Sequence, residues 1–179
     1  MTTTVARSWI EDATLQFRKY KALADAALSQ VDDGDFFRTI DPESNSIALV
    51  VKHLAGNMRS RWTDFLTSDG EKPDRDRDEE FETRETDTRR SLFDAWEAGW
   101  ALTFASVGSL TEADLLREIR IRGQAHTVLQ AVHRQLTHYA YHIGQIVFLA
   151  RHFAGGRWKS LSIPKGKSKE FNEKMMNPK

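Results

Sequence analysis

The sequence contains no cysteine, has no excess of charge of either sign and has no long apolar run. Without cysteine, the chain forms no disulfide and offers no thiolate as a nucleophile, as a zinc ligand or as a ligand of an iron–sulfur cluster. Any metal site must therefore use histidine, carboxylate or backbone ligands. Any thiol chemistry would need a thiol that comes from a small molecule.

The charges balance, with 26 Lys and Arg residues against 26 Asp and Glu residues. Because a dedicated nucleic-acid-binding protein usually carries a basic excess, we expect no nucleic-acid partner. No stretch reaches the ~18 apolar residues that a membrane span needs, so we expect no membrane partner. The N-terminal residues lack a basic segment followed by an apolar run, which indicates no signal peptide and predicts a cytoplasmic location.

The 179 residues are 40% hydrophobic and 29% charged, which is typical of a folded domain. Apolar residues recur at helical spacing in four segments, and each segment predicts an amphipathic helix. Four such helices in a chain of this length predict an all-α fold, a four-helix bundle over residues 1–156. The helices are expected over residues 4–31, 47–66, 89–107 and 127–153.

Local signals mark the beginnings of two of these helices. Ser44-Asn45-Ser46 supplies N-cap candidates before the second helix, and Thr127-x-x-Gln130 has the pattern of a capping box before the fourth. Residues 32–35 form a turn cluster, and residues 36–45 are expected to be a loop.

Three segments outside the helices differ in composition. Residues 70–88 are dense in charges of both signs and predict a solvated surface loop. Within residues 109–126, the alternation from Glu118 to Arg122 predicts a short strand or hairpin between the third and fourth helices, with Gly123-Gln124 as its turn. Residues 157–179 are rich in Lys and Arg, and we expect a basic strap that is packed on the bundle and has a mobile end.

Three of the six histidines point to a metal site. His138 and His142 are four residues apart, so both imidazoles project from one side of the fourth helix and can bind one ion. At 100° per residue they lie beside the apolar stripe among uncharged residues, whereas a solvated face would carry Lys and Glu. His53 has a similar offset on the second helix. If these helices are neighbours, three imidazoles meet with an open fourth position.

An ordinary explanation stays open for each of these histidines. A pair at this spacing also arises by chance, and His53 alone could be a surface or boundary histidine. The other three histidines are expected to be structural or exposed: His126 precedes the fourth helix, His133 points away from the pair, and His152 lies near a helix C-terminus. Asp64 is too far along the second helix to join the ligands.

The same residues carry a family resemblance. His53 and Asn57, together with the run Leu136-Thr-His-Tyr-Ala-Tyr-His-Ile-Gly-Gln145, resemble the DinB-like superfamily. More narrowly, Trp62-Thr-Asp-Phe-Leu with Asp69-Gly-Glu-Lys-Pro73, and residues 158–166, resemble a DinB-like subfamily of unknown function. The resemblance covers nearly the whole chain.

The resemblance implies up-down-down-up helix connections and commonly a homodimer. It also implies a divalent metal, often nickel or zinc, held by His53, His138 and His142. Asn57 and Gln145 are then candidate hydrogen-bond partners of the ligands. Characterised relatives are similar to metal-dependent thiol transferases and isomerases that use low-molecular-weight thiols, and some are described as hydrolases.

Two functions are consistent with these features. The first is a metal-dependent enzyme in which an activated thiol or water attacks a small electrophilic substrate. Since no carboxylate is clearly placed as a general base, a thiol transferase is favoured over a hydrolase. The second is a non-catalytic metal- or ligand-binding dimer that acts in a stress response. A fourth protein ligand would favour the second function, and a pocket open to the metal would favour the first.

Overall fold

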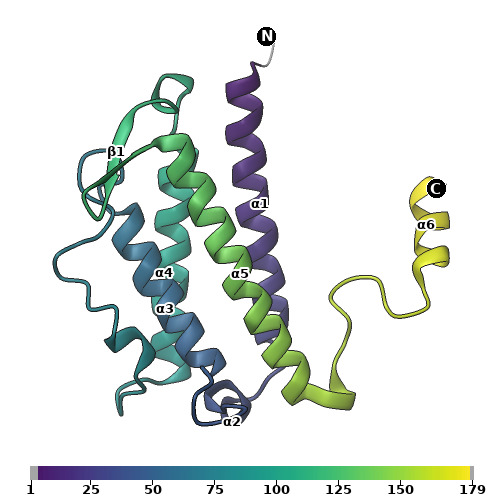
Figure 1. The fold of residues 1–179 in the computed structure, drawn as a ribbon. Coiled ribbons are helices and arrows are strands. Elements are labelled where there is room, and N and C mark those ends of the chain that lie inside the picture. Colours follow the sequence, from purple (N-terminus) through teal and green to yellow (C-terminus); the bar gives the residue numbers. More distant parts are fainter. Residues whose placement is uncertain (1–3, 178–179) are drawn as a thin grey trace.

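The computed structural model describes residues 4–177 and is mostly helical. The four long helices α1 (Val5–Leu28), α3 (Ile47–Trp62), α4 (Arg89–Gly108) and α5 (Val128–Ala154) lie side by side (Figure 1). The most extensive contacts join α3 to α4 and α1 to α5, and α3 also contacts α5. The two helices that carry the candidate metal ligands are therefore neighbours.

Aromatic rings from all four long helices meet in the core. Phe17 of α1 is fully buried, and its ring centroid lies 6.0 Å from that of Trp62 on α3, 6.3 Å from Trp100 on α4 and 5.8 Å from Tyr139 on α5. Trp62 Nε1 donates a hydrogen bond of 2.9 Å to the Tyr139 hydroxyl, which satisfies both polar groups inside the core. These contacts fix how the four helices are rotated against one another.

The predicted starts of α3 and α5 are confirmed. The Ser46 side chain accepts a hydrogen bond from a backbone N–H in the first turn of α3, and Thr127 and Gln130 form a capping box at the start of α5. The predicted end of α3 near residue 66 is wrong, because the helix ends at Trp62. Asp64 has a φ of 49°, a left-handed conformation that a right-handed helix cannot contain.

The segment between the first two long helices differs from prediction. Helix α2 (Asp33–Phe37) lies where a turn and a loop were expected, because the Asp32 side chain caps it by accepting a hydrogen bond of 2.9 Å from the Asp35 N–H. Three short 3₁₀ helices are η1 (Glu79–Phe81), η2 (Glu112–Asp114) and η3 (Gly155–Arg157).

The hairpin expected between the third and fourth long helices is confirmed. Strand β1 (Glu118–Ile121) pairs antiparallel with β2 (Gln124–Thr127). The turn is Arg122-Gly123, one residue earlier than predicted, and both residues have positive φ, 55° and 72°. The Asp69 carboxylate accepts hydrogen bonds of 2.8 Å from both turn N–H groups, which ties the hairpin to the segment after α3.

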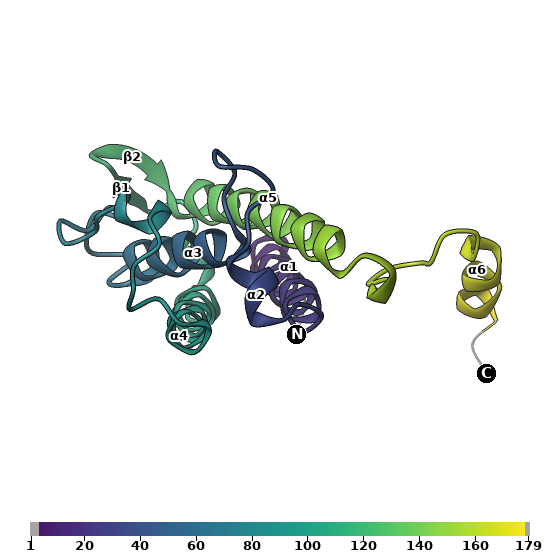
Figure 2. The ribbon, with the colours of Figure 1, turned by 90° about the horizontal axis from the view of Figure 1, so that it is seen from below.

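The segment after α5 begins on the body of the molecule and then leaves it. Trp158 and Leu161 pack against the core, and Lys159 forms two backbone hydrogen bonds with the Gln30 side chain. These contacts agree with a packed strap, but helix α6 (Ser168–Met176) was not predicted. Figures 1 and 2 show α6 standing apart from the other helices. The division into two units at residue 156 stays a prediction.

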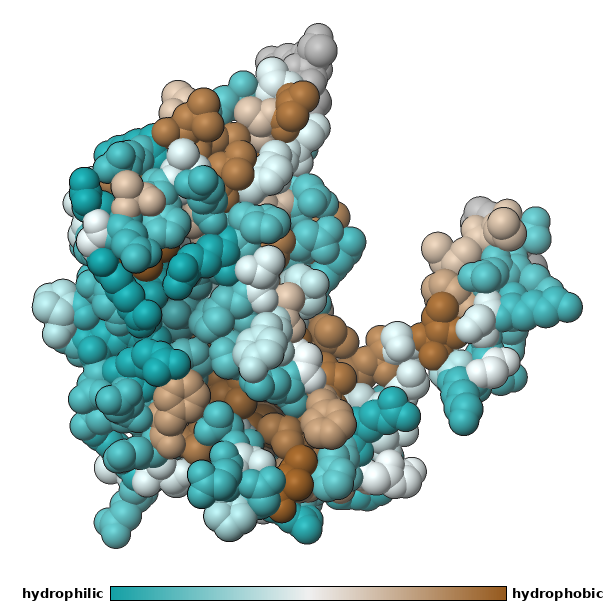
Figure 3. Space-filling view, in the orientation of Figure 1, coloured by the Kyte–Doolittle hydropathy of each residue, from teal (hydrophilic) through white to brown (hydrophobic). Residues whose placement is uncertain are grey.

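The surface over α3 and α5 is divided by polarity. Figure 3 shows mainly hydrophilic residues over the upper part of these helices and a group of hydrophobic residues near their lower ends. None of the helices that the structure describes combines the length and the apolar character of a membrane-spanning segment.

The aromatic core yields a stability prediction. Phe17→Ala should lower the free energy of unfolding by about 3–5 kcal/mol, because it removes contacts to three other helices and leaves a cavity. Leu15→Ala on the same helix is the control, since Leu15 is 47% exposed and its loss should cost less than about 1 kcal/mol. Chemical denaturation measures both, and equal losses would contradict a central position of Phe17.

Candidate metal centre

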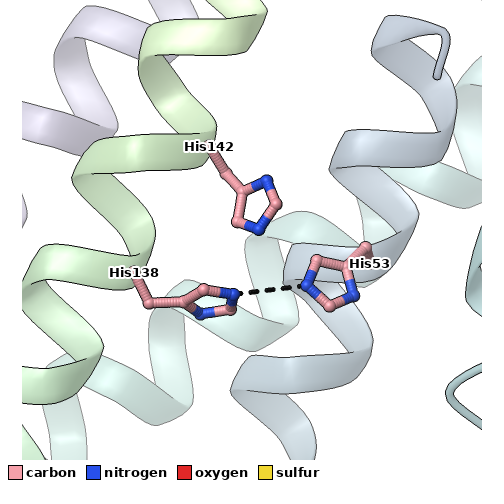
Figure 4. Close-up of side chains that lie close together, drawn as sticks. All are labelled: His53, His138 and His142. Carbon is pink, nitrogen blue, oxygen red and sulfur yellow. Dashed lines mark hydrogen bonds between the residues drawn. The ribbon is translucent and has the colours of Figure 1, made fainter. Parts of the chain in front are cut away.

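Three histidines come together between α3 and α5. His53 comes from α3, and His138 and His142 come from α5 (Figure 4). Each ring offers one nitrogen, and the three nitrogens lie within 4.8 Å of one another. The Nε2 atoms of His53 and His138 are 3.3 Å apart. The structure thus brings together the three histidines that the spacing selected.

His53 is buried rather than a surface or boundary residue. It is 3% exposed, because α3 is covered by α4 on one side and by α5 and η1 on others. The Phe81 ring of η1 stacks on the His53 imidazole with centroids 4.7 Å apart and an interplanar angle of 29°. The ring therefore has little freedom to turn away from the two histidines of α5.

The prediction of a solvated loop over residues 70–88 is wrong at its centre. Glu80 is buried, and its Oε2 lies 2.8 Å from His53 Nδ1. Arg75, whose side chain is 2% exposed, donates two hydrogen bonds of 2.8 Å to the same carboxylate. The balanced charges at this point compensate one another inside the protein instead of being solvated. Phe81, an aromatic residue within the charged segment, was the available signal of burial.

Hydrogen bonds orient two of the three rings. His53 Nδ1 donates to Glu80, and His142 Nδ1 donates to the Gln145 side-chain oxygen at 2.7 Å. Metal-binding histidines commonly donate their second N–H in this way, and the bond sets the tautomer and the ring orientation. Both rings then present Nε2 to the centre of the cluster. Gln145 is therefore where the sequence expected a partner of a ligand, whereas Glu80 was missed.

Asn57, the other expected partner, contacts none of the three rings through a hydrogen bond. Its side-chain oxygen accepts a hydrogen bond of 3.3 Å from the Tyr139 hydroxyl in the core. Asn57 still lines the pocket that contains the histidines. It links the aromatic core to the floor of this pocket.

The environment keeps the α5 histidines uncharged. Burial, together with the neighbouring His142 and His53, lowers the pKa of His138 to about 3. Burial also lowers the pKa of His142 below its ordinary value. Both rings are neutral at pH 7, and a neutral imidazole has the lone pair that a metal ion requires.

The donor set fits a divalent transition-metal ion. Imidazole nitrogens suit zinc, nickel, copper and iron. Zn–N bonds of about 2.0–2.1 Å allow two ligand nitrogens to be at most about 4.2 Å apart, so small ring rotations would complete the set. Within residues 4–177, no further histidine or carboxylate joins the group. Three protein ligands with an open position are typical of catalytic rather than structural zinc sites.

A pocket of about 600 Å³ opens onto the three histidines. Its walls come from α3, the segment before η1, the hairpin turn and α5. A larger cavity of about 710 Å³ lies between α3 and α4, but none of the three histidines lines it. The smaller pocket is therefore the one that gives a small molecule access to the cluster.

The remaining histidines lie outside the cluster, as expected. His126 is in β2, and its Nδ1 bonds the Gln124 carbonyl oxygen at 3.0 Å. His133 and His152 are exposed residues of α5. Asp64 follows the end of α3 and is not part of the group.

Comparison with known proteins identifies the family of the chain. Residues 4–167 match the family described as Protein of unknown function (DUF1572). No curated protein and no solved structure matches the chain. The matched range spans all four long helices and includes the three clustered histidines with Glu80 and Gln145. The chain therefore belongs to DUF1572, a protein family of unknown function.

Proposed function

We propose that this protein is a divalent-metal-dependent enzyme of the DinB-like type, in which a thiol or water attacks a small electrophilic substrate. The convergence of three imidazoles at an open pocket carries this proposal. A bound divalent ion, with nickel or zinc as the first candidates, would supply Lewis acidity that lowers the pKa of a water or a low-molecular-weight thiol. A volume of about 600 Å³ fits a small-molecule substrate.

The arrangement of the helices supports the DinB-like part of the proposal. In Figure 1, α1 and α5 run in one direction along the molecule, and α3 and α4 run in the opposite direction. These directions, with the contacts of α1 to α5 and of α3 to α4, agree with an up-down-down-up four-helix bundle. The homodimer is inferred from the family resemblance alone.

The carboxylate of Glu80 orients the candidate ligand His53 and does not act in proton transfer. Burial raises the pKa of Glu80, but hydrogen bonds from Arg75 and His53 outweigh burial, and the pKa of Glu80 is lowered overall. Glu80 is thus ionised and fully engaged, which disqualifies it as a general base. No carboxylate lines the pocket in the described part of the chain. A thiol transferase, which needs no protein base, is therefore favoured over a hydrolase.

The open coordination position favours an enzyme over a non-catalytic metal- or ligand-binding protein. A structural site would be expected to have a fourth protein ligand. Among residues 4–177, only His53, His138 and His142 form such a group. All three histidines line the pocket, so a small molecule in it could reach an ion that they held.

Removal of one ligand tests the metal site. His138→Ala should sharply reduce the metal content of the purified protein and leave the helical circular-dichroism spectrum unchanged, because only one imidazole is lost. Elemental analysis measures the metal. His133→Ala, an exposed histidine of the same helix, is the matched control and should keep the wild-type content. Equal metal content in both variants and the wild type would refute the site.

The partner of His53 provides a second test. Glu80→Gln should weaken metal affinity by about 10–100-fold, because a neutral amide holds the His53 N–H less firmly. Glu79→Gln is the control, because Glu79 is adjacent to Glu80 in the sequence but its side chain is 48% exposed. Competition with a chelator of known affinity measures both constants. If Glu80→Gln bound metal as tightly as the control, Glu80 would only help to pack the loop and would not support the metal site.

The close approach of η1 to α3 provides a third test. A Cβ added at Gly56 would overlap the Glu80 carboxylate, with the Glu80 Cδ only 2.8 Å away. Because Arg75 and His53 hold that carboxylate, Gly56→Ala should lower stability by about 1–3 kcal/mol and also weaken metal binding. Gly144→Ala, where a Cβ meets nothing within 4 Å, should instead raise stability by about 0.5–1 kcal/mol. Chemical denaturation measures the stability of both variants, and chelator competition measures their metal affinity. A Gly56→Ala variant as stable as Gly144→Ala would contradict the close contact between Gly56 and Glu80.

A further inference from the structure

The pocket over the three histidines is lined by arginines and, among the described residues, by no carboxylate. These arginines come from α3, from the segment before η1, from the hairpin turn and from α5. Since those elements are distant in sequence, the balanced net charge of the chain conceals this local concentration. The arginines are Arg61, Arg75, Arg77, Arg122 and Arg134.

Two carboxylates form ion pairs with these arginines and compensate part of this charge. Glu71 contacts Arg61 at 2.9 Å, Arg75 at 3.3 Å and Arg122 at 3.0 Å, so one carboxylate serves three guanidinium groups. Glu80 takes the remaining hydrogen bonds of Arg75 and is shared with a histidine. Asp69, which binds the N–H groups of the hairpin turn, is a third carboxylate nearby. Five guanidinium charges therefore face three carboxylates, and the pocket keeps an excess of positive charge.

Arg77 and Arg134 provide this excess. Neither forms an ion pair with a carboxylate in the part of the chain that the structure describes. The Arg77 guanidinium carbon lies 5.1 Å from the centroid of the Phe81 ring, and the same ring stacks on His53. Arg134 is one helical turn before His138 on α5, and so on the same side of the helix. Both free charges lie beside the candidate metal centre.

The backbone of the hairpin turn holds another arginine at the pocket. Arg122 has a φ of 55°, in a two-residue turn where asparagine, aspartate or glycine is usually found. The Asp69 carboxylate stabilises this turn through its two N–H groups. Residues kept in unfavourable backbone conformations gather at ligand sites, because function rather than stability selects them.

The floor of the pocket has unused hydrogen-bonding capacity. Arg61 Nε and Gln135 Oε1 are buried and have no hydrogen-bond partner in residues 4–177. Both residues line the pocket. Buried polar atoms of native proteins nearly always have a partner, so these side chains are not arranged for packing alone.

We propose that this pocket binds its small-molecule substrate through an oxyanion, a carboxylate or a phosphate group, held by Arg77 and Arg134 beside the three histidines. Guanidinium groups bind such oxyanions with paired hydrogen bonds, and the excess positive charge concentrates anions at the mouth. The inference rests on the proposed function, because it names the chemical class of the substrate. The test below separates the two, since anion binding is measured without metal.

The test begins with metal-free protein, prepared with a chelator, so that an anion cannot bind to an ion. Isothermal titration with inorganic phosphate and, separately, with succinate tells a phosphate site from a carboxylate site. Succinamide is the uncharged control. We expect one or both anions to bind, with affinity that falls as salt is added, and succinamide not to bind. Failure of both anions to bind at low salt would overturn the proposal.

Variants locate the binding site. The double variant Arg77→Gln and Arg134→Gln should bind the effective anion at least about tenfold more weakly and keep the wild-type metal content, because neither residue is a ligand. Arg90→Gln is the matched control, since its side chain is 92% exposed on α4. Equal anion affinity in the wild type and the double variant would refute the proposal. Loss of metal binding in His138→Ala with retained anion binding supports both proposals, whereas unchanged metal content there refutes only the metal centre.

Discussion

The buried hydrogen bond between Glu80 and His53 is the interaction on which the candidate site depends. The same carboxylate receives two hydrogen bonds from Arg75, so three polar side chains compensate one another away from water. Any one of them buried alone would be costly, because its charge or polar atoms would be unsatisfied. Together they hold residues 70–88 against α3 and leave His53 Nε2 facing the histidines of α5. The segment also builds one wall of the pocket.

The packing of the aromatic core orients the other two candidate ligands, His138 and His142. Tyr139 follows His138 directly in α5, and its hydroxyl is bonded to Trp62 and Asn57 in the core. Since successive helical residues point about 100° apart, burying Tyr139 turns His138 and His142 toward α3. The stability of the core and the geometry of the site are thus coupled through the rotation of one helix.

Charge has two roles that the composition does not distinguish. Inside the site, opposite charges pair with little exposure to water, as in the contact of Arg75 with Glu80. Around the mouth, arginines outnumber carboxylates, and the result is a cationic entrance beside the two neutral imidazoles of α5. Such an entrance concentrates anions, while the uncharged rings remain free to bind a cation.

The features that depend on nearby residues can be predicted from the sequence. Local spacing predicts features that arise within a few residues. These are the helix periods, the capping box of α5, the hairpin and the common side of His138 and His142. The contacts between distant residues depend on the packing of the helices and appear only in the folded structure. Glu80 meets His53 across 27 positions, and His53 meets His138 across 85. Such contacts depend on how helices pack, and a pattern read along one segment contains no information about them.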